Sequence, residues 1–237
     1  MIPMTTQRYK VGVEEIEIFT YKSENDGAVC AGADTANCLY NYLNCLNKQT
    51  LNVIDLGANV GSTSIALGCL FRGKIKIYAV EPHPELYAIL VENIKKHNLI
   101  DIVIPFNLAI GSTQLFIQSK LNPHNTGTSI TSAFETDAVI KVDCIKLDDF
   151  LLKNNITHAD ILKIDVEGAE YDIFSEFTLW DIVTKYHIEF HDIPVSKQGE
   201  IRKFGFYDEM LGPVFGLRRH ILSKLRLNYR TFQARMF

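Results

Sequence analysis

A glycine-rich segment at the end of an apolar run is the clearest candidate for ligand chemistry. Residues 53–61 read V-I-D-L-G-A-N-V-G, which has the form strand, D-x-G-x-N-x-G, helix. Gly57 allows the backbone to turn and to approach a ligand closely, and Gly61 allows the following helix to pack tightly. Asp55 adds a carboxylate at the strand end, which favours a ligand with a positive charge.

The spacing of these glycines separates two classes of cofactor. Dinucleotide-binding folds use G-x-G-x-x-G, so that a pyrophosphate meets free N–H groups at a helix N-terminus. Residues 53–61 do not have this spacing, they lack the G-K-[ST] ending of a P-loop, and Asp55 would repel phosphate. S-adenosylmethionine fits better, because it carries an ammonium and a sulfonium group and no phosphate.

A second carboxylate follows the next apolar run. Glu81 comes directly after the segment 74–80 and lies 20 residues after Gly61. At this spacing a carboxylate accepts hydrogen bonds from both hydroxyls of a ribose. Taken singly, the glycine segment also reads as an ordinary tight turn, and Glu81 as a solvated acid at a strand end. Together they predict a nucleoside cofactor site.

Ionisable residues also follow two later apolar runs. Asp165 ends the run 161–164, and His187, Glu189 and His191 alternate with apolar residues, so that all three face one side of a strand. In open α/β sheets, ligands bind at the carboxyl ends of the parallel strands. We therefore predict Asp165, Glu189 and His191 as catalytic residues.

S-adenosylmethionine carries a transferable methyl group, and the family resemblance given below implies a hydroxyl as its acceptor. Such a transfer requires an acceptor oxygen held close to the methyl group and removal of its proton. Histidine has the natural pKa for such a base, so His191 is one candidate. Asp165 is either the base itself or a group that polarises His191. Alternatively, Asp165, Glu189 and His191 hold a divalent cation (Mg²⁺ or Mn²⁺) that lowers the pKa of the hydroxyl. Structural readings stay open: His187 as a core histidine, Asp165 as a helix N-cap, Glu189 in an ion pair and His191 as a loop residue.

Two polar segments are candidates for acceptor contacts. The loop 122–128, N-P-H-N-T-G-T, is predicted to fold over the acceptor with His124 or Asn125 on its hydroxyls, and Glu167 joins them as a substrate-binding residue. The alternative is a solvated connection. Residues 218–237 hold six Lys or Arg and no acid, a pattern that suits an anionic acceptor, a membrane surface or a solvated amphipathic element.

The elements that must position these residues alternate between strand and helix. We expect strands at 51–56, 74–80, 101–108, 161–166 and 183–190, helices at 62–71 and 84–99, short extra strands at 114–119 and 139–145, a short helix at 147–154, and a helix within 196–237. Such alternation predicts a parallel sheet that is covered on both faces.

The first 48 residues show a different pattern. Residues 8–22 alternate between polar and apolar and predict a hairpin, and residues 34–47 predict a helix with Asp34 as its N-cap. No convincing linker follows them. We therefore expect an N-terminal extension over 1–48 and one main domain over 49–237.

Seven motifs occur in an order that resembles the FkbM-type S-adenosylmethionine-dependent methyltransferases. They are VIDLGANVG, VEPHPE, NLAIG, NTGTSI, VDCIKLDDFL, LKIDVEGAE and HIEFH, over roughly residues 50–191. The resemblance implies a class I methyltransferase (Rossmann-like) α/β fold with a mostly parallel seven-stranded sheet and helices on both faces. It also implies O-methylation, typically of a hydroxyl on a sugar or a natural product.

The resemblance also implies roles for individual residues. The methionine and ribose side of the cofactor site would be formed by Asp55, Gly57, Ala58, Asn59 and Gly61, the ribose would be bound by Glu81, and the adenine would lie beside Asn107 and Ala109. Asp165 would lie beside the methyl group, with Glu189 and His191 at the tip of the next strand.

Composition limits the partners. The 237 residues carry a net charge of −4, so the chain is not a polycation and nucleic acid is disfavoured as a partner. No apolar stretch reaches membrane-spanning length, and residues 1–12 do not resemble a signal peptide. Five cysteines without a C-x-x-C pair suggest a reducing, cytoplasmic location.

The predicted acceptor is thus a carbohydrate or another small molecule with a hydroxyl group, such as a glycan or a nucleotide-linked sugar. An RNA or natural-product hydroxyl is the alternative among acceptors. A non-catalytic cofactor-binding module is the alternative among functions.

Overall fold

The computed structural model describes residues 4–21, 26–112, 115–118, 130–131, 139–190, 207–210 and 220–225. Its centre is one sheet with the order β13 (Tyr207–Met210), β14 (His220–Leu225), β12 (Val183–Phe190), β11 (Ala159–Ile164), β3 (Leu51–Leu56), β4 (Ile75–Val80) and β5 (Val103–Phe106). The five strands from β12 to β5 are parallel, whereas β14 is antiparallel to both of its neighbours. The mostly parallel sheet predicted from the sequence is confirmed.

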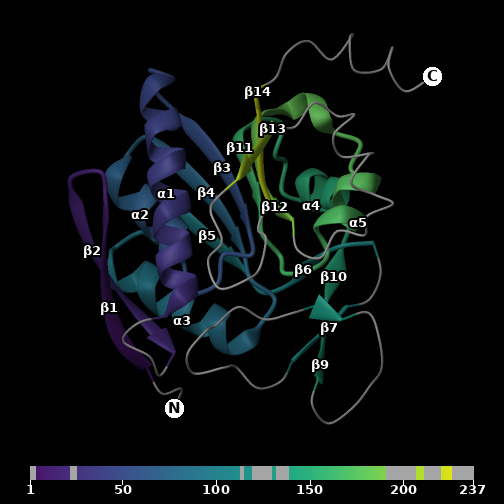
Figure 1. Ribbon diagram of the computed structural model, residues 1–237, viewed down its shortest axis with the longest axis horizontal. Helices are drawn as coiled ribbons and strands as arrows, with labels where there is room; N and C mark the ends of the chain where they lie inside the picture. The colour runs from purple at the N-terminus through teal and green to yellow at the C-terminus, as the bar shows by residue number, and fades with distance from the viewer. Residues whose placement is uncertain are drawn as a thin grey trace.

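Helices cover both faces of this sheet (Figure 1). One face carries α1 (Gly27–Cys45), α2 (Ser62–Leu70) and α3 (Pro84–Lys96), and the other carries α4 (Leu147–Lys153), α5 (Glu170–Glu176) and the short 3₁₀ helix η1 (Trp180–Ile182). Successive residues of a strand face opposite sides of the sheet. Val53 packs in the apolar core on the α1–α3 side, the first core, and Ile54 packs in the second core on the α4–α5 side. The apolar runs are therefore buried on both sides, as parallel strands require.

The N-terminal residues share the first core rather than forming one of their own. β1 (Met4–Val11) and β2 (Glu14–Tyr21) form an antiparallel hairpin, which places Val11 and Ile18 with residues of α2 and α3 in one apolar cluster. Two polar contacts join this hairpin to the glycine segment. The Tyr9 hydroxyl donates to the carbonyl of Ser62 over 2.6 Å, and the buried Asn93 amide donates to the carbonyls of Phe19 and Val60 over 2.9 and 2.8 Å.

Helix α1 begins seven residues before the predicted N-cap, so that prediction was wrong. Its N-cap is Asp26, which is fully buried and accepts from the amide of Ala28 over 3.0 Å. The Gln7 side chain of β1 accepts from the Asp26 amide over 2.8 Å, which is a tertiary contact. Gly27 and Gly32 weaken the helical signal of the first turns, and this explains why Asp34 looked like the start.

The segment after β5 forms two small sheets. β6 (Ala109–Ile110) pairs with β10 (Cys144–Ile145), and β7 (Leu115–Gln118) pairs with β8 (Ile130–Thr131) and β9 (Val139–Val142). The single strand predicted over 139–145 is therefore two strands, because the chain changes sheets at Asp143. The carbonyl of Asp143 accepts from the amide of Ala109 over 2.7 Å at this change.

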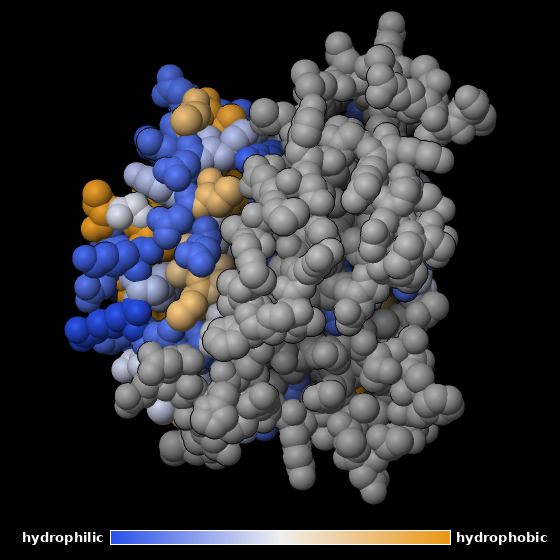
Figure 2. Space-filling view, viewed as in Figure 1, coloured by the Kyte–Doolittle hydropathy of each residue, from blue (hydrophilic) through white to orange (hydrophobic). Residues whose placement is uncertain are grey.

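The helix expected within 196–237 does not occur in the parts of that range that the structure describes. Residues 207–210 and 220–225 are strands β13 and β14, because β14 pairs with β12 and β13 pairs with β14. No helix among the described residues is long and apolar enough to cross a membrane. The described surface visible in Figure 2 is mainly hydrophilic, with isolated hydrophobic side chains.

Candidate active site at the carboxyl ends of the parallel strands

The glycine segment forms a tight turn directly after β3. Gly57 has φ +79°, and a Cβ placed there would lie 1.7 Å from the carbonyl oxygen of Asp165. Gly61 has φ +95°, and its Cβ would lie 2.6 Å from a methyl group of Leu90. Both positions therefore require glycine. The amides of Gly57 and Ala58 both donate to the carbonyl of Val80, over 3.0 and 2.9 Å, so the turn is fixed against the end of β4.

Glu81 lies under this turn with only 3% of its surface exposed. Its carboxylate accepts from the amide of Asn59 and from the amide of His83, each over 2.8 Å. Asn59 itself has φ +53°, which asparagine tolerates better than most residues. Burial raises the pKa of Glu81 to about 7, although the two backbone hydrogen bonds lower it. The structure thus brings the predicted ribose-binding acid into contact with the predicted cofactor loop.

An apolar pocket opens beside this turn. It is lined by Leu56, Gly57, Val80, Pro82, Leu108, Ala109, Ile110 and Val166. These residues come from the ends of β3, β4 and β11 and from β6. The side-chain amide of Asn107 donates to the carbonyls of Glu81 and Pro82, over 2.9 and 3.0 Å, and so fixes one wall. A flat, apolar group such as an adenine ring suits a pocket of this composition.

Asp55 is not a surface carboxylate, contrary to its reading as an acid facing a cationic ligand. It is 0% exposed, and its Oδ2 accepts from the Ser64 hydroxyl over 2.6 Å. Its Oδ1 lies 3.0 Å from the ammonium of Lys163. Asp55 therefore supports the glycine turn from inside the protein, and its negative charge is already paired with Lys163.

Asp165 lies at the tip of β11, and its side chain is 26% exposed. The ammonium of Lys163 lies 3.5 Å from its Oδ2. Asp165 does not cap a helix, since the N-cap of α5 is Ala169. Asp165 lies beside the glycine turn and is accessible from solvent, whereas Glu189, the other predicted catalytic residue that the structure describes, is buried.

Glu189 and His187 lie on β12, on the same face of the sheet as Lys163. Glu189 is 4% exposed, and its negative charge acts on Lys163. His187 pairs in register with Lys163 and is 2% exposed. Burial and the nearby Lys163 ammonium lower the pKa of His187 to about 4, so this side chain is a neutral core histidine at neutral pH.

The predicted metal site is not supported by the described residues. They contain no group of three His, Cys, Asp or Glu residues placed to hold an ion, and the predicted ligand His191 lies outside them. Moreover, the ammonium of Lys163 lies where a cation would bind beside Asp165. A divalent ion there would be repelled by this charge, so Asp165 and Glu189 do not fit a metal centre.

Glu167 follows Asp165 in a loop with a left-handed backbone. It has φ +57°, Gly168 has φ +128°, and the amides of Val166 and Gly168 both donate to the buried carboxylate of Glu170. The loop is thus held from inside, with Glu167 partly exposed near Asp165. The other two predicted acceptor-binding residues, His124 and Asn125, lie outside the described residues, as does most of the basic segment 218–237.

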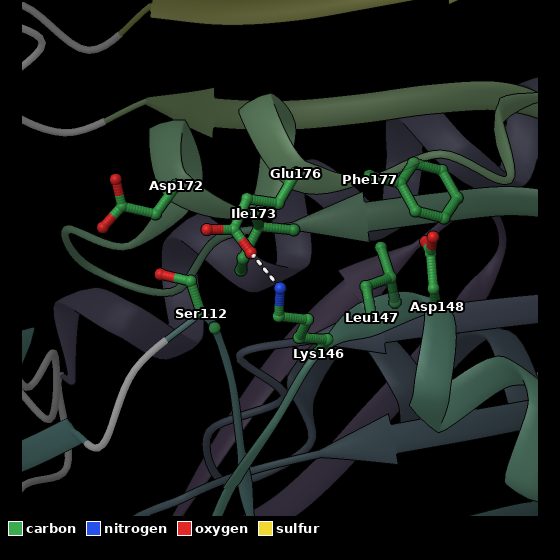
Figure 3. A pocket seen from close by; sticks show the side chains of 9 residues that line it. Ser112, Lys146, Leu147, Asp148, Asp172, Ile173, Glu176 and Phe177 are labelled. Carbon is green, nitrogen blue, oxygen red and sulfur yellow. Dashed lines mark ion pairs between the residues drawn. The ribbon is translucent and has the colours of Figure 1, made fainter.

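A second pocket lies between α4, α5 and the end of β6 (Figure 3). Lys146 and Glu176 form an ion pair of 2.9 Å across it. None of the predicted site residues lines this pocket. Its apolar lining is flanked by the charged side chains of Lys146, Asp148, Asp172 and Glu176, of which three are acidic.

Lys163 is the functional candidate that the sequence analysis missed. The sequence does indicate it, since a lysine in the middle of the apolar run 161–164 must have an ionic partner when the strand is buried on both faces. The prediction considered only the acids at the strand ends. No sequence pattern indicates Ser64, which hydrogen-bonds to Asp55.

Three comparisons with known proteins bear on this site. The family model described as "Methyltransferase FkbM domain" matches residues 55–230. Hexuronic acid methyltransferase AglP of Haloferax volcanii is 24% identical over 124 residues, which cover 52% of this chain and 48% of that protein. Methyltransferase 1 of Beauveria bassiana is 24% identical over 161 residues, which cover 59% of this chain and 64% of that protein. The matched regions are thus less than two thirds of the length of either relative.

Solved structures resemble the fold. Methyltransferase FkbM from Methylobacillus flagellatus superposes with a TM-score of 0.51 at 12% identity, over 74% of this chain and 44% of that one. The N-terminal domain of human METTL16, solved in complex with SAH, superposes with a TM-score of 0.50 at 13% identity, over 81% of this chain and 68% of that one. At such identities the likeness concerns the fold alone.

Proposed function

We propose that this chain, which belongs to the FkbM methyltransferase family, transfers a methyl group from S-adenosylmethionine to a hydroxyl of a sugar. The cofactor part of the proposal is supported by three features of the site: a turn that requires glycine, a buried carboxylate and an apolar pocket between them. METTL16, a structural neighbour with the same fold, was solved with S-adenosylhomocysteine bound.

The bound cofactor would supply an electrophilic methyl group on its sulfonium. The rest of the cofactor would then leave as a neutral thioether. Glu81 accepts hydrogen bonds from the ribose hydroxyls, and the pocket lined by Ala109 and Val166 excludes water from the base. The turn from Gly57 to Gly61 brings the backbone against the methionine side. Asn107 would hold the Glu81–Pro82 backbone in the wall of the pocket that receives the nucleoside.

Asp165 takes the proton of the acceptor hydroxyl in this proposal. As the acceptor oxygen bonds to the methyl carbon, its proton becomes strongly acidic, and a carboxylate is then a sufficient base. With the cofactor bound, the carbon–sulfur electron pair would stay on sulfur, and a carboxylate oxygen of Asp165 would take the proton. The observation that supports the proposal is the close approach of Gly57 to the Asp165 carbonyl oxygen, together with the solvent access of the Asp165 side chain.

A sugar as the acceptor is supported by the relative AglP, whose name describes a hexuronic acid methyltransferase. A sugar offers several hydroxyls. Their high pKa is compatible with the proposed reaction, because the proton is lost to Asp165 only as the methyl group is transferred. The five cysteines are free thiols, which agrees with a reducing, cytoplasmic setting for a nucleotide-linked sugar. RNA is the competing acceptor, and the net charge of −4 disfavours it.

The first experiment is a calorimetric titration of the chain with S-adenosylhomocysteine, repeated on Glu81→Ala. We expect micromolar binding by the wild type and its loss in the variant. Asp101→Asn is the matched control, because this exposed carboxylate precedes the amino end of β5, whereas Glu81 follows the carboxyl end of the parallel strand β4. The absence of binding by the wild type would refute the proposal.

The second experiment tests the acceptor with radiolabelled methyl donor. Hexuronic acids, neutral sugars and short RNA are offered in parallel, each with Mg²⁺ and with a chelator. We expect label on a sugar, no dependence on Mg²⁺, and a loss of at least about 100-fold in rate for Asp165→Asn. Label on RNA alone would refute the sugar acceptor.

A further inference from the structure

Lys163 is a buried cation that contacts both halves of the candidate site. Its side chain is 4% exposed. The ammonium lies 3.0 Å from Asp55 Oδ1, donates to the carbonyl of Gly57 over 3.0 Å, and lies 3.5 Å from Asp165 Oδ2. One side chain on β11 thus reaches the end of β3, the cofactor turn and the candidate base.

This lysine stays charged. Burial alone lowers the pKa of a lysine, but the charges of Asp55 and Asp165 outweigh it and hold the pKa of Lys163 above its usual value. A buried ammonium is tolerated only when it is paired and hydrogen-bonded. The three oxygens around Lys163 meet that condition.

We propose that Lys163 is a positioning residue that holds the cofactor turn and Asp165 in one cluster and sets the net charge that the sulfonium meets. The inference rests on the proposed function, because it assumes that S-adenosylmethionine binds over this turn. It goes further by naming a residue that determines how strongly the site prefers the cationic cofactor over its neutral product.

The charge argument follows from the cluster itself. Asp55, Lys163 and Asp165 together carry a net charge of −1, and Glu189, which is the same in every variant below, adds a constant negative charge beside them. S-adenosylmethionine and S-adenosylhomocysteine share their amino acid and nucleoside parts and differ by the positive charge on sulfur. A more negative cluster therefore strengthens binding of the first relative to the second, and a less negative cluster weakens it.

Three variants change this charge in steps. Lys163→Met makes the cluster −2, Asp55→Asn makes it 0, and the double variant Asp55→Asn/Lys163→Met restores −1. Asparagine keeps an oxygen for the Ser64 hydroxyl, and methionine fills most of the space of the lysine stem. The double variant is the matched control, because it removes the buried lysine without changing the charge.

The measurement is the dissociation constant of each ligand for each variant, by calorimetry at pH 8, with thermal melting as a check of folding. The readout is the preference ratio, Kd of S-adenosylhomocysteine divided by Kd of S-adenosylmethionine. We expect this ratio to rise at least about threefold in Lys163→Met, to fall at least about threefold in Asp55→Asn, and to stay near the wild-type value in the double variant.

We also expect both dissociation constants to rise about tenfold in the double variant, because the Gly57 carbonyl loses its donor. A purely structural role for Lys163 would weaken both ligands equally and leave the ratio constant, and this result would overturn the proposal. If Lys163→Met does not fold, the other two variants still test the proposal. An unchanged preference ratio in Asp55→Asn would overturn the proposal, and so would unchanged dissociation constants in the double variant. Failure of the wild type to bind either ligand would instead refute the proposed function.

Discussion

If Glu81 binds the ribose as proposed, cofactor binding depends on pH near neutrality. Burial raises its pKa from 4.5 to about 7, against the effect of the His83 and Asn59 amides. Ribose hydroxyls donate hydrogen bonds, and only the ionised carboxylate accepts from both of them. If binding requires the ionised form, the apparent Kd is multiplied by one plus the ratio of protonated to ionised Glu81. That factor is about 11 at pH 6 and about 1.1 at pH 8.

We therefore expect S-adenosylhomocysteine to bind about tenfold more tightly at pH 8 than at pH 6. Calorimetric titration in buffers of matched ionic strength measures the change. Glu81→Gln should bind weakly and with little dependence on pH, because its amide does not titrate. Asp101→Asn, an exposed carboxylate variant remote from the site, should follow the wild type.

The same group has an opposite signature in stability. A carboxyl with a raised pKa stabilises the folded state below its unfolded pKa of about 4.5, and this contribution is lost as the pH rises to about 7. The shift corresponds to about 3 kcal/mol. Denaturant unfolding should show the wild type losing up to about this amount, relative to Glu81→Gln, between pH 4.5 and 8. Equal pH profiles for the two proteins, in binding and in unfolding, would refute the assignment of the titration to Glu81.

Three further predictions concern the scaffold. Gly57→Ala should lower the free energy of unfolding by more than about 2 kcal/mol, because its Cβ meets the Asp165 carbonyl, and thermal melting with Gly73→Ala as the uncrowded comparison measures this. Asp160→Asn should cost about 1–3 kcal/mol at pH 7, because the buried carboxylate accepts from Lys48 and from the Asn52 amide. The ion pair holds the pKa of Asp160 below its usual value, so the difference in denaturant unfolding should vanish as the pH falls below that pKa; a constant difference would contradict the ion pair. Removal of residues 1–48 should leave a chain without a cooperative melting transition, since this segment shares the core of α2 and α3, and a normal melt would show the segment to be dispensable.

The sequence predicted those parts of the molecule that depend on local pattern. The apolar runs and the helices between them were located to within a few residues, because each strand is buried on both faces and each helix has one apolar side. The contact of the glycine turn with Glu81 also followed, since both lie at the ends of neighbouring parallel strands. These features need only the chain order and the periodicity of burial.

Features that depend on tertiary partners were missed. Asp55 was read as a ligand for a cation, whereas Lys163, distant in sequence, already pairs with it. The true cap of α1, Asp26, is held by Gln7 of the hairpin, so no local pattern distinguished it from Asp34. Strand β14 owes its conformation to pairing with β12, and nothing within the segment 196–237 revealed that partner.

The contacts of Tyr9 and Asn93 couple the N-terminal hairpin to the glycine turn. They attach it to the carbonyls of Ser62 and Val60, which flank Gly61 at the end of the cofactor turn. A ligand that immobilises the turn must therefore also stabilise the docking of the hairpin, and loosening the hairpin must weaken the ligand by the same free energy. Backbone amides of β1 and β2 should therefore report cofactor occupancy, and we expect their hydrogen exchange to slow when S-adenosylhomocysteine binds.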